Sequence, residues 1–417
     1  MDFPHLLETN LPPERLALLR SAGEIALEEG MPLYLVGGAV RDLLLGRPLE
    51  DLDLVVEGDA ETLAYVVAKR LSGEVVARSQ FSTAKLKVDG LSLDLVTARR
   101  ESYPRPGALP QVVPGTMKDD LARRDFSINA MAFPIHKMPG GELLDPHGGM
   151  EDLQRGLIRV LHERSFIDDA TRILRALRYE QRLGFRLEES TEALLRRDLS
   201  MLDTISGDRL RKEIHLWIRE RRPCPLLLRA YHLGVLGAIH PSLSRAGPAL
   251  ESAMQLAGDG HLEEQVWIAL MAYALSPQEG EHLIQRLRMP SGWATTVRDA
   301  IAIRDVLPTV SQPDVPPAQL YDALVRRSPA AVRACALATP REEARWNLSL
   351  FLEKLRHVRP ALNGRDLIEL GIPQGPAVGE MLSRLRRSQL EGAVGSREEE
   401  VTLVKQMMAS DQPPLLP

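Results

Sequence analysis

The stretch YLVGGAVRDLLLGRPLEDLDLVV, residues 34–56, decides the fold of this chain. An apolar run leads into Gly37-Gly38, which predicts a buried strand, a tight turn and then a helix. Gly46 predicts the end of that helix. From Asp51 onward acidic and apolar residues alternate, as they do in a half-buried strand. The stretch therefore predicts a strand, a glycine turn, a helix and a second strand.

The second predicted strand carries two carboxylates. Residues i and i+2 of a strand face the same way, so Asp51 and Asp53 share one face while Leu52 and Leu54 face the core. Two adjacent negative charges are unfavourable unless a cation lies between them, and Mg²⁺ prefers carboxylate and phosphate oxygens. Taken alone, an Asp-x-Asp pair is more often a solvated strand face. Asp94, on a later predicted strand, is a candidate third carboxylate, with a structural or solvent role as the alternative.

The turn before these carboxylates favours a chemical role. Gly37 and Gly38 have no side chains, so their backbone N–H groups can approach a triphosphate, and the N-terminus of the next helix favours anions. A glycine turn, a short helix and then Asp-x-Asp form a more specific pattern than any of the three alone. We therefore expect nucleotide chemistry at this second strand.

Composition limits the class of protein. The 417 residues exceed one ordinary core and predict roughly two to four domains. The net charge of −5 and the aromatic content of 4% disfavour a protein that coats nucleic acid or stacks bases on aromatic rings, so RNA contacts would rest on local basic patches. Two cysteines cannot build a disulfide framework or a zinc site unaided. With no signal-like or membrane-spanning apolar run, we expect a soluble cytoplasmic protein.

The pattern of apolar residues changes along the chain. Residues 60–71 predict a helix, and residues 73–99 predict successive short strands. Residues 101–116 carry four prolines and two glycines, which predict a loop. Beyond residue 133 amphipathic helices dominate, and no strand pattern of any length follows residue 162. The sequence thus predicts an α/β head followed by a helical remainder.

Four motifs in sequence order resemble those of a known family. Residues 34–56 resemble the signature of the class II tRNA nucleotidyltransferase and bacterial poly(A) polymerase family, which has a DNA-polymerase-β-like head. RRDFSINAMAF (123–133) is similar to its ribose-binding motif, and DPHGGMEDLQRGLIRVL (145–161) to its hinge motif. FIDDATRILRALRYEQRLGF (166–185) is similar to its base-reading helix, with a weaker similarity over residues 205–218.

The resemblance implies an α+β chain with four parts. These are a nucleotidyltransferase head (1–140), a helical neck for base recognition (141–205), a helical body (206–310) and a helical tail that binds tRNA (311–417).

The resemblance also implies roles for individual residues. Asp51 and Asp53 would hold two Mg²⁺ ions, with Asp94 as a candidate helper, and pyrophosphate would leave towards Gly37, Gly38 and Arg41. Arg124, Asp125 and Asn129 would position the ribose. Asp169 and Arg172, three residues apart on one predicted helix, would read the base, with Arg175 and Arg178 further along that helix. Without the family pattern, the Arg-Arg-Asp run and the Asp169–Arg172 pair would be ordinary surface ion pairs.

The implied activity is template-free addition of nucleotides to the 3′ end of tRNA from CTP and ATP. Poly(A) polymerases of the family carry strongly basic segments, and a pI near 6.1 disfavours that activity. The long loop over residues 101–116 favours an enzyme that can add the terminal A. We expect full CCA addition, with A-only addition as the alternative. An inactive RNA-binding relative is disfavoured because Asp51 and Asp53 are both present, and no obligate protein partner is evident.

Overall fold

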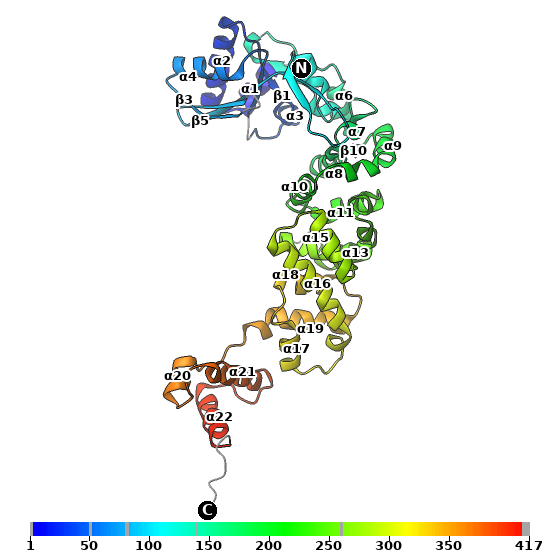
Figure 1. Cartoon of the computed structure of the whole chain (residues 1–417). Coiled ribbons are helices and arrows are strands. Elements are labelled where there is room, and N and C mark those ends of the chain that lie inside the picture. The colour runs from blue at the N-terminus through cyan, green and yellow to red at the C-terminus, as the bar shows by residue number, and fades with distance from the viewer. Residues whose placement is uncertain (1–2, 50–51, 80–82, 139, 259–261, 411–417) are drawn as a thin grey trace, which may run out of the picture. The chain divides into compact units, whose positions relative to one another are not determined.

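The computed structural model describes residues 3–49, 52–79, 83–138, 140–258 and 262–410 (Figure 1). The chain forms two compact units. The first comprises Met1–Leu216 and Leu233–Ala238, and the second comprises Trp217–His232 and Ile239–Pro417. The predicted division into four parts stays a prediction, since the head and neck expected from the sequence both lie in the first unit.

A six-stranded mixed sheet forms the centre of the head. Its strands are β1 (Leu33–Val36), β2 (Asp53–Val56), β3 (Glu74–Ser79), β4 (Thr83–Val88), β5 (Leu91–Thr97) and β8 (Ala132–Pro134). They lie in the order β3-β4-β5-β2-β1-β8. β2 and β5 run parallel, and the other neighbouring pairs are antiparallel. This arrangement confirms the strand–turn–helix–strand expected over residues 34–56, and it places β2 in the interior of the sheet.

The two faces of this sheet are covered unequally. Leu54 of β2 belongs to a large apolar core with α1 (Phe3–Asn10), α2 (Pro13–Glu28), α3 (Gly38–Leu44) and α4 (Ala60–Arg70). Val55 belongs to a small cluster on the other face, which is covered by α5 (Met117–Ala122). Because side chains alternate along a strand, Asp53 projects on the face of Val55. The thinly covered face therefore leaves Asp53 exposed.

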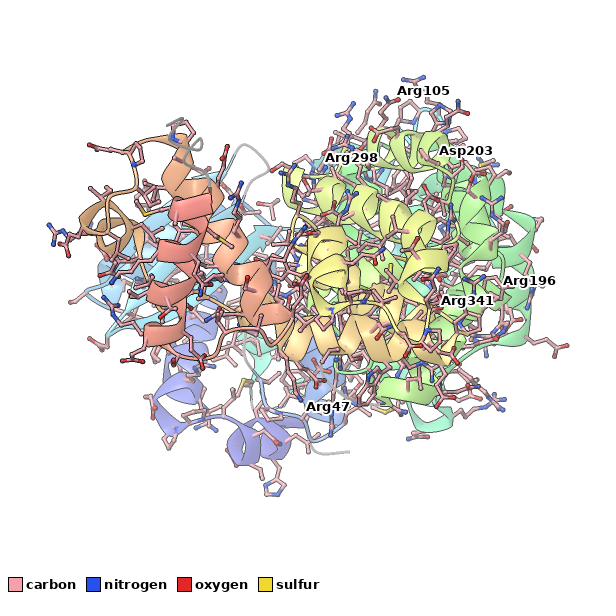
Figure 2. All side chains as sticks on the ribbon, turned by 90° about the horizontal axis from the view of Figure 1, so that it is seen from below. Arg47, Arg105, Arg196, Asp203, Arg298 and Arg341 are labelled. Carbon is pink, nitrogen blue, oxygen red and sulfur yellow. The ribbon has the colours of Figure 1, made fainter. Side chains whose placement is uncertain are left out.

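The proline-rich stretch forms a hairpin where we predicted a loop. β6 (Arg99–Ser102) and β7 (Gln111–Pro114) pair antiparallel, from Arg99↔Pro114 to Ser102↔Gln111. The prediction of a loop was wrong because none of the prolines lies in the middle of a strand. They lie in the connection or at the last paired position, where the missing proline N–H does not interrupt the hydrogen bonds between the strands. Arg105, in the connection, projects outward (Figure 2).

Helices dominate the chain beyond the sheet, as predicted. The rest of the first unit holds α6 (Gly149–Arg155), α7 (Ser165–Asp168), α8 (Thr171–Leu183) and α9 (Glu189–Arg197). Two more helices, α10 (Gly207–Ile218) and α12 (Val235–Ile239), begin in the first unit and end in the second. Two strands of two residues each, β9 (Leu157–Ile158) and β10 (Arg186–Leu187), pair parallel within the neck. The neck is therefore not helical throughout. Short 3-10 helices span Ser127–Asn129, Ile135–Lys137 and Leu199–Thr204.

The second unit is helical in every described element. Its α-helices are α11 (Pro223–His232), α13 (Gly247–Ala257), α14 (Glu264–Ala272), α15 (Pro277–Arg286), α16 (Ser291–Val310), α17 (Pro317–Leu324), α18 (Pro329–Ala338), α19 (Glu342–Glu353), α20 (Gly364–Glu369), α21 (Pro376–Leu390) and α22 (Arg397–Ser410), with 3-10 helices at Pro241–Arg245 and Leu355–His357. The last three α-helices share a separate apolar core around Leu367 and Leu385. Among the helices of the described residues, none combines the length and the apolar character that crossing a membrane requires.

Candidate active site

A row of charged side chains crosses three neighbouring strands of the head sheet. Asp53 of β2 is the register partner of Asp94 of β5, and Asp94 is the register partner of Lys85 of β4. Side chains at paired positions lie on the same face of a sheet. The Nζ of Lys85 lies 3.3 Å from Oδ2 of Asp94, and both side chains are half exposed. Asp51, the other predicted catalytic carboxylate, lies outside the described residues.

This row offers oxygen ligands of the kind that a divalent cation prefers. Asp53 and Asp94 occupy adjacent positions on parallel strands, on the exposed face of the sheet. Carboxylate oxygens are hard ligands that suit Mg²⁺. No cluster of three or more acidic, histidine or cysteine ligands occurs among the described residues. The described part of the predicted metal site is therefore a pair of carboxylates, with Lys85 at its edge.

The glycine turn is shaped around an arginine. Gly37 has φ +64°, and a Cβ atom at this position would collide with the guanidinium of Arg124. The N–H of Gly37 donates to the carbonyl of Met131 (3.1 Å). Arg124 in turn donates to Oδ2 of the fully buried Asp120 (2.9 Å). The predicted phosphate-binding role of Gly37 is therefore not available through its N–H, which is already bonded, whereas Gly38 begins α3 directly behind it.

The predicted ribose residues lie together, although a 3-10 turn rather than an α-helix joins them. Asn129 Nδ2 donates to Oδ1 of Asp125 (3.0 Å), and Nη1 of Arg41 donates to Oδ1 of Asn129 (2.6 Å). Arg124 contacts the carbonyl of Asn129 (3.4 Å). Arg41 is 5% exposed and its Nε and Nη2 are bonded to Asp42, so it orders this network from inside.

Asp125 joins the head to the helix α8. Its Oδ2 accepts from Nε (2.9 Å) and Nη2 (2.5 Å) of Arg175. Burial raises the pKa of Asp125, but the charge of Arg175 and the hydrogen bond from Asn129 outweigh burial and leave that pKa lowered overall. Arg178, one turn further along α8, is buried and donates from Nε to Glu213 (3.2 Å). In this structure Arg175 and Arg178 are thus bonded to protein carboxylates.

Asp169 does not lie on the base-reading helix, contrary to our prediction. Its backbone is extended (φ −139°, ψ 99°), and α8 begins at Thr171. Its Oδ1 accepts from the N–H (2.9 Å) and the hydroxyl (2.7 Å) of Thr171. A third donor is Nη2 of Arg209 on α10 (2.7 Å). The side chain thus bonds the first N–H of α8, one of the N–H groups that have no partner within the helix, while the N-cap position itself is Ala170.

One acceptor atom of Asp169 and one donor atom of Arg172 form no hydrogen bond with the described part of the chain. Within the described part of the chain no hydrogen bond reaches Oδ2 of Asp169, whose side chain is 21% exposed. Nη2 of the buried Arg172 donates to the carbonyl of Arg123 (2.6 Å), while its Nη1 is buried and has no hydrogen-bond partner among the described residues. A buried donor without a partner is costly and points to an interaction made with a ligand.

Glu101 ties the hairpin to these residues. Its side chain is 6% exposed and accepts from Arg99 (2.9 Å), from Nη1 of Arg123 (3.1 Å) and from the hydroxyl of Tyr103 (2.9 Å). Burial and the charge of Glu101 raise the pKa of Tyr103 to about 12. The backbone carbonyl of Arg123 also accepts a hydrogen bond from the buried Arg172. Arg123 therefore links Glu101, on the first strand of the hairpin, to Arg172.

Three residues of the site could not be recognised from sequence patterns. Arg209 lies 40 positions from its partner Asp169, and Lys85 meets Asp94 only through strand pairing. Tyr179 lies among three arginines, and its i,i+4 spacing from Arg175 was the one local signal that pointed to it.

Known proteins resemble this chain over most of its length. Residues 33–159 match the poly A polymerase head domain family. The chain is 36% identical to the A-adding tRNA nucleotidyltransferase of Halalkalibacterium halodurans, over 98% of this chain and 96% of that protein. It is also 36% identical to the A-adding tRNA nucleotidyltransferase of Geobacter sulfurreducens, over 98% of this chain but 49% of that protein. The chain thus spans about half the length of the Geobacter relative.

Solved structures give the same family. The Thermotoga maritima CCA-adding enzyme complexed with tRNA_CCA superposes with a TM-score of 0.82 at 31% identity, over 98% of this chain and 99% of that one. Two further structures, described as complexes of a CCA-adding enzyme with CTP and with ATP, give TM-scores of 0.84 and 0.82 at 30% identity over 100% of this chain and 99% of each of theirs. The chain therefore belongs to the tRNA nucleotidyltransferase family and carries a poly A polymerase head domain.

Proposed function

We propose that this chain transfers AMP from ATP to the 3′ end of a tRNA that ends in CC. The observation that carries nucleotidyl transfer is the Asp53–Asp94 register pair on the exposed face of the head sheet. Addition of the terminal A is supported by the names of the two relatives at 36% identity, both of which are A-adding enzymes.

The carboxylates would act on the reacting groups. Bound Mg²⁺ would supply charge neutralisation at the α-phosphate and a more acidic attacking hydroxyl. Asp53 and Asp94, with Asp51, are the residues that would hold it. Lys85 holds Asp94 in an ion pair at the edge of this row. In-line attack of the tRNA 3′-hydroxyl on the α-phosphate forms the new phosphodiester bond and releases pyrophosphate.

Base selection would rest on the open acceptor and donor beside α8. Adenine and cytosine both present an amino group next to an unprotonated ring nitrogen. Oδ2 of Asp169 would accept from the amino group, and Nη1 of Arg172 would donate to the ring nitrogen. Guanine and uracil present the opposite pattern, a carbonyl next to an N–H, which would leave both protein groups unpaired. Asp125 and Asn129 would position the ribose.

Full CCA addition is the second candidate. The acceptor–donor pair described above suits cytosine as well as adenine, and the structural neighbours at TM-scores of 0.82 to 0.84 include complexes of a CCA-adding enzyme with both CTP and ATP. The CCA addition expected from the sequence stays a prediction, as do the use of Mg²⁺ and the cytoplasmic location.

One experiment separates the candidates. The purified protein is incubated with Mg²⁺, CTP and ATP and with tRNAs that lack CCA, CA or only the terminal A, and the 3′ ends are sequenced. Extension of only the tRNA that lacks the terminal A is the expected result. Extension of all three would establish CCA addition, and extension of none would refute both candidates.

A further inference from the structure

Tyr179 lies at the centre of a group of arginines that the proposed chemistry does not explain. The Cζ atoms of Arg41, Arg175 and Arg178 lie 5.2, 5.5 and 5.3 Å from the centroid of its ring. All three distances fall within the range of a cation–π contact. Phe126 meets the same ring edge-to-face, with the centroids 5.8 Å apart. One half-buried ring therefore contacts three guanidinium groups.

Three cations around one ring repel one another, and the structure offsets this repulsion in two ways. Each arginine has its own carboxylate: Arg41 pairs with Asp42, Arg175 with Asp125 and Arg178 with Glu213. The electron-rich face of the ring attracts all three cations in addition. The ring thus holds the guanidinium groups at fixed positions around it.

The arginines connect the ring to the proposed ribose residues. Arg41 donates to Asn129 (2.6 Å), and Arg175 donates to Asp125 (2.9 Å). Asn129 and Asp125 are themselves hydrogen-bonded (3.0 Å). Tyr179 therefore closes a loop of contacts that runs from α3, through the pair Asn129–Asp125, to α8.

The ring and the hydroxyl of Tyr179 both contact these arginines. Nη2 of Arg175 lies 3.4 Å from the Tyr179 oxygen, a long hydrogen bond compared with its 2.5 Å contact to Asp125, and the hydroxyl also interacts with the side chain of Arg41. Losing the hydroxyl should therefore weaken this support only in part. Losing the aromatic face should release Arg41 and Arg175 from their common support.

We propose that Tyr179 is a positioning residue for sugar recognition, which braces Asn129 and Asp125 through Arg41 and Arg175. The inference rests on the proposed function, because it takes these two residues to contact the ribose. The base-reading residues Asp169 and Arg172 are not members of this loop of contacts. A defect at Tyr179 should therefore affect the choice between ribose and deoxyribose and leave the choice of base intact.

The test is direct binding, so it does not depend on turnover. Dissociation constants for ATP, 2′-dATP and GTP are measured by calorimetry, with Mg²⁺ present, on the wild type, Tyr179→Phe, Tyr179→Leu and Tyr179→Met. Phe185→Leu, the loss of an aromatic ring that packs beside Gly156, is the matched control. Circular dichroism checks that each variant is folded, and Tyr179→Met provides a second non-aromatic replacement, with a longer and unbranched side chain than Tyr179→Leu.

The expected result is a change in one ratio only. The preference for ATP over dATP should fall about tenfold in Tyr179→Leu and Tyr179→Met, the size expected for losing two cation–π contacts. Tyr179→Phe, which loses the hydroxyl but keeps the ring, should lose less of that preference than the Leu and Met variants, and Phe185→Leu should keep it. Every variant should keep its preference for ATP over GTP. An unchanged ATP/dATP ratio in folded Leu and Met variants would overturn the inference, as would a wild type without sugar preference. Failure of the wild type to extend tRNA would instead refute the proposed function.

Discussion

At the scale of single residues, the carboxylate that would read the base is held by groups outside its own motif. Thr171 bonds Oδ1 of Asp169 from the start of α8, and Arg209 bonds the same oxygen from α10. With one oxygen occupied, the carboxylate cannot rotate without breaking these bonds. Oδ2 is thereby held in a fixed orientation, in which we propose that it accepts a hydrogen bond from the amino group of the incoming base.

Replacing Arg209 by Gln should therefore damage base selection. We expect the preference for ATP over GTP in tRNA extension to fall about tenfold or more, since a charge-assisted hydrogen bond contributes about 1.5–3 kcal/mol. In an Asp169→Asn background the same substitution should add little, because its partner charge is gone. Arg211→Gln is the control, since Arg211 forms a partly exposed ion pair with Asp208 on the same helix. An equal loss for ATP and GTP would show a general effect of Arg209 on folding instead.

The sequence indicated most of these residues but not their contacts. Spacing and motif order pointed to Asp53, Asp94 and Arg172, because each lies in a local pattern. The contact of Arg209 with Asp169 depends on how α10 packs, and no local pattern encodes it. The helical position predicted for Asp169 was wrong because its side chain bonds the first N–H of α8 from an extended residue just before the helix.

At the scale of elements, the hairpin β6–β7 depends on a glycine. Gly107 has φ +73°, and a Cβ atom there would collide with the backbone of Thr204. The connection between the two strands therefore packs against the 3-10 helix Leu199–Thr204 only if residue 107 has no side chain. Composition alone predicted a loop in this region because its four prolines are typical of loops, although residues at either end form paired strands.

Gly107→Ala should displace this connection. We expect faster cleavage within residues 103–110 in limited proteolysis, since a segment that loses its packing opens more often. Gly90→Ala is the matched control: Gly90 also has a positive φ (+82°), but nothing lies within 4 Å of its Cβ position. If both variants were cleaved at the wild-type rate over residues 103–110, the Gly107 contact would not hold the connection.

The neck helix α9 is capped by Glu188, which gives a prediction about pH. Burial raises the pKa of Glu188, and hydrogen bonds from Ser190 and Thr191 with the charge of Arg159 more than offset it, lowering this pKa from 4.5 to about 2. A depressed pKa in the folded state stabilises the protein above pH 4.5, and this contribution is lost as the pH falls towards about 2.

Glu188→Ala should lower the free energy of unfolding by about 1 kcal/mol at neutral pH, the usual contribution of a helix cap. The difference from the wild type should shrink between pH 4.5 and about 2. Urea unfolding at a series of pH values measures it, with the neighbouring exposed residue changed in Glu189→Ala as the control. A difference that did not depend on pH would contradict the assigned role of the Glu188 charge.

At the scale of the whole molecule, an acidic protein must bind RNA through selected arginines. Many arginines are already neutralised: Arg298 of α16, which projects outward in Figure 2, forms two bonds with Glu281 (2.6 and 2.8 Å). Arg333 and Arg356 differ, because neither guanidinium forms an ion pair within the described part of the chain. Both line a pocket of about 280 Å³ in the second unit. They are therefore two arginines of this unit that we expect to meet a phosphate, although Glu263 lines the same pocket.

Arg333→Glu with Arg356→Glu should weaken tRNA binding and leave ATP binding unchanged. Each phosphate contact that is lost should also reduce the slope of binding against salt concentration by about one. Filter binding at several salt concentrations measures both quantities. Arg298→Glu, a single replacement of the same kind at an arginine that is already paired, should have a smaller effect per charge changed. If the double variant and Arg298→Glu weakened tRNA binding equally per charge changed, net charge alone would explain the loss, and a local phosphate site at Arg333 and Arg356 would be refuted.

The overall division of the chain was partly predictable. Hydrophobic periodicity separated the sheet-containing head from the helical remainder, and the structure confirms that change. The first boundary between the two compact units along the chain, after Leu216, could not be predicted, because it falls within the continuous helix α10. A boundary inside a helix leaves no proline- or glycine-rich linker in the sequence.

The central claim is that Asp53 and its neighbouring carboxylates transfer a nucleotide to tRNA, and single-turnover kinetics test it most directly. ATP labelled at the α-phosphate is mixed with CC-ended tRNA and either the wild type or Asp53→Asn, and label in the tRNA is followed over time. We predict that the wild type incorporates one AMP and that Asp53→Asn is slower by about a thousandfold or more while still binding tRNA. Incorporation by Asp53→Asn at a near wild-type rate, or no incorporation by the wild type, would contradict the account.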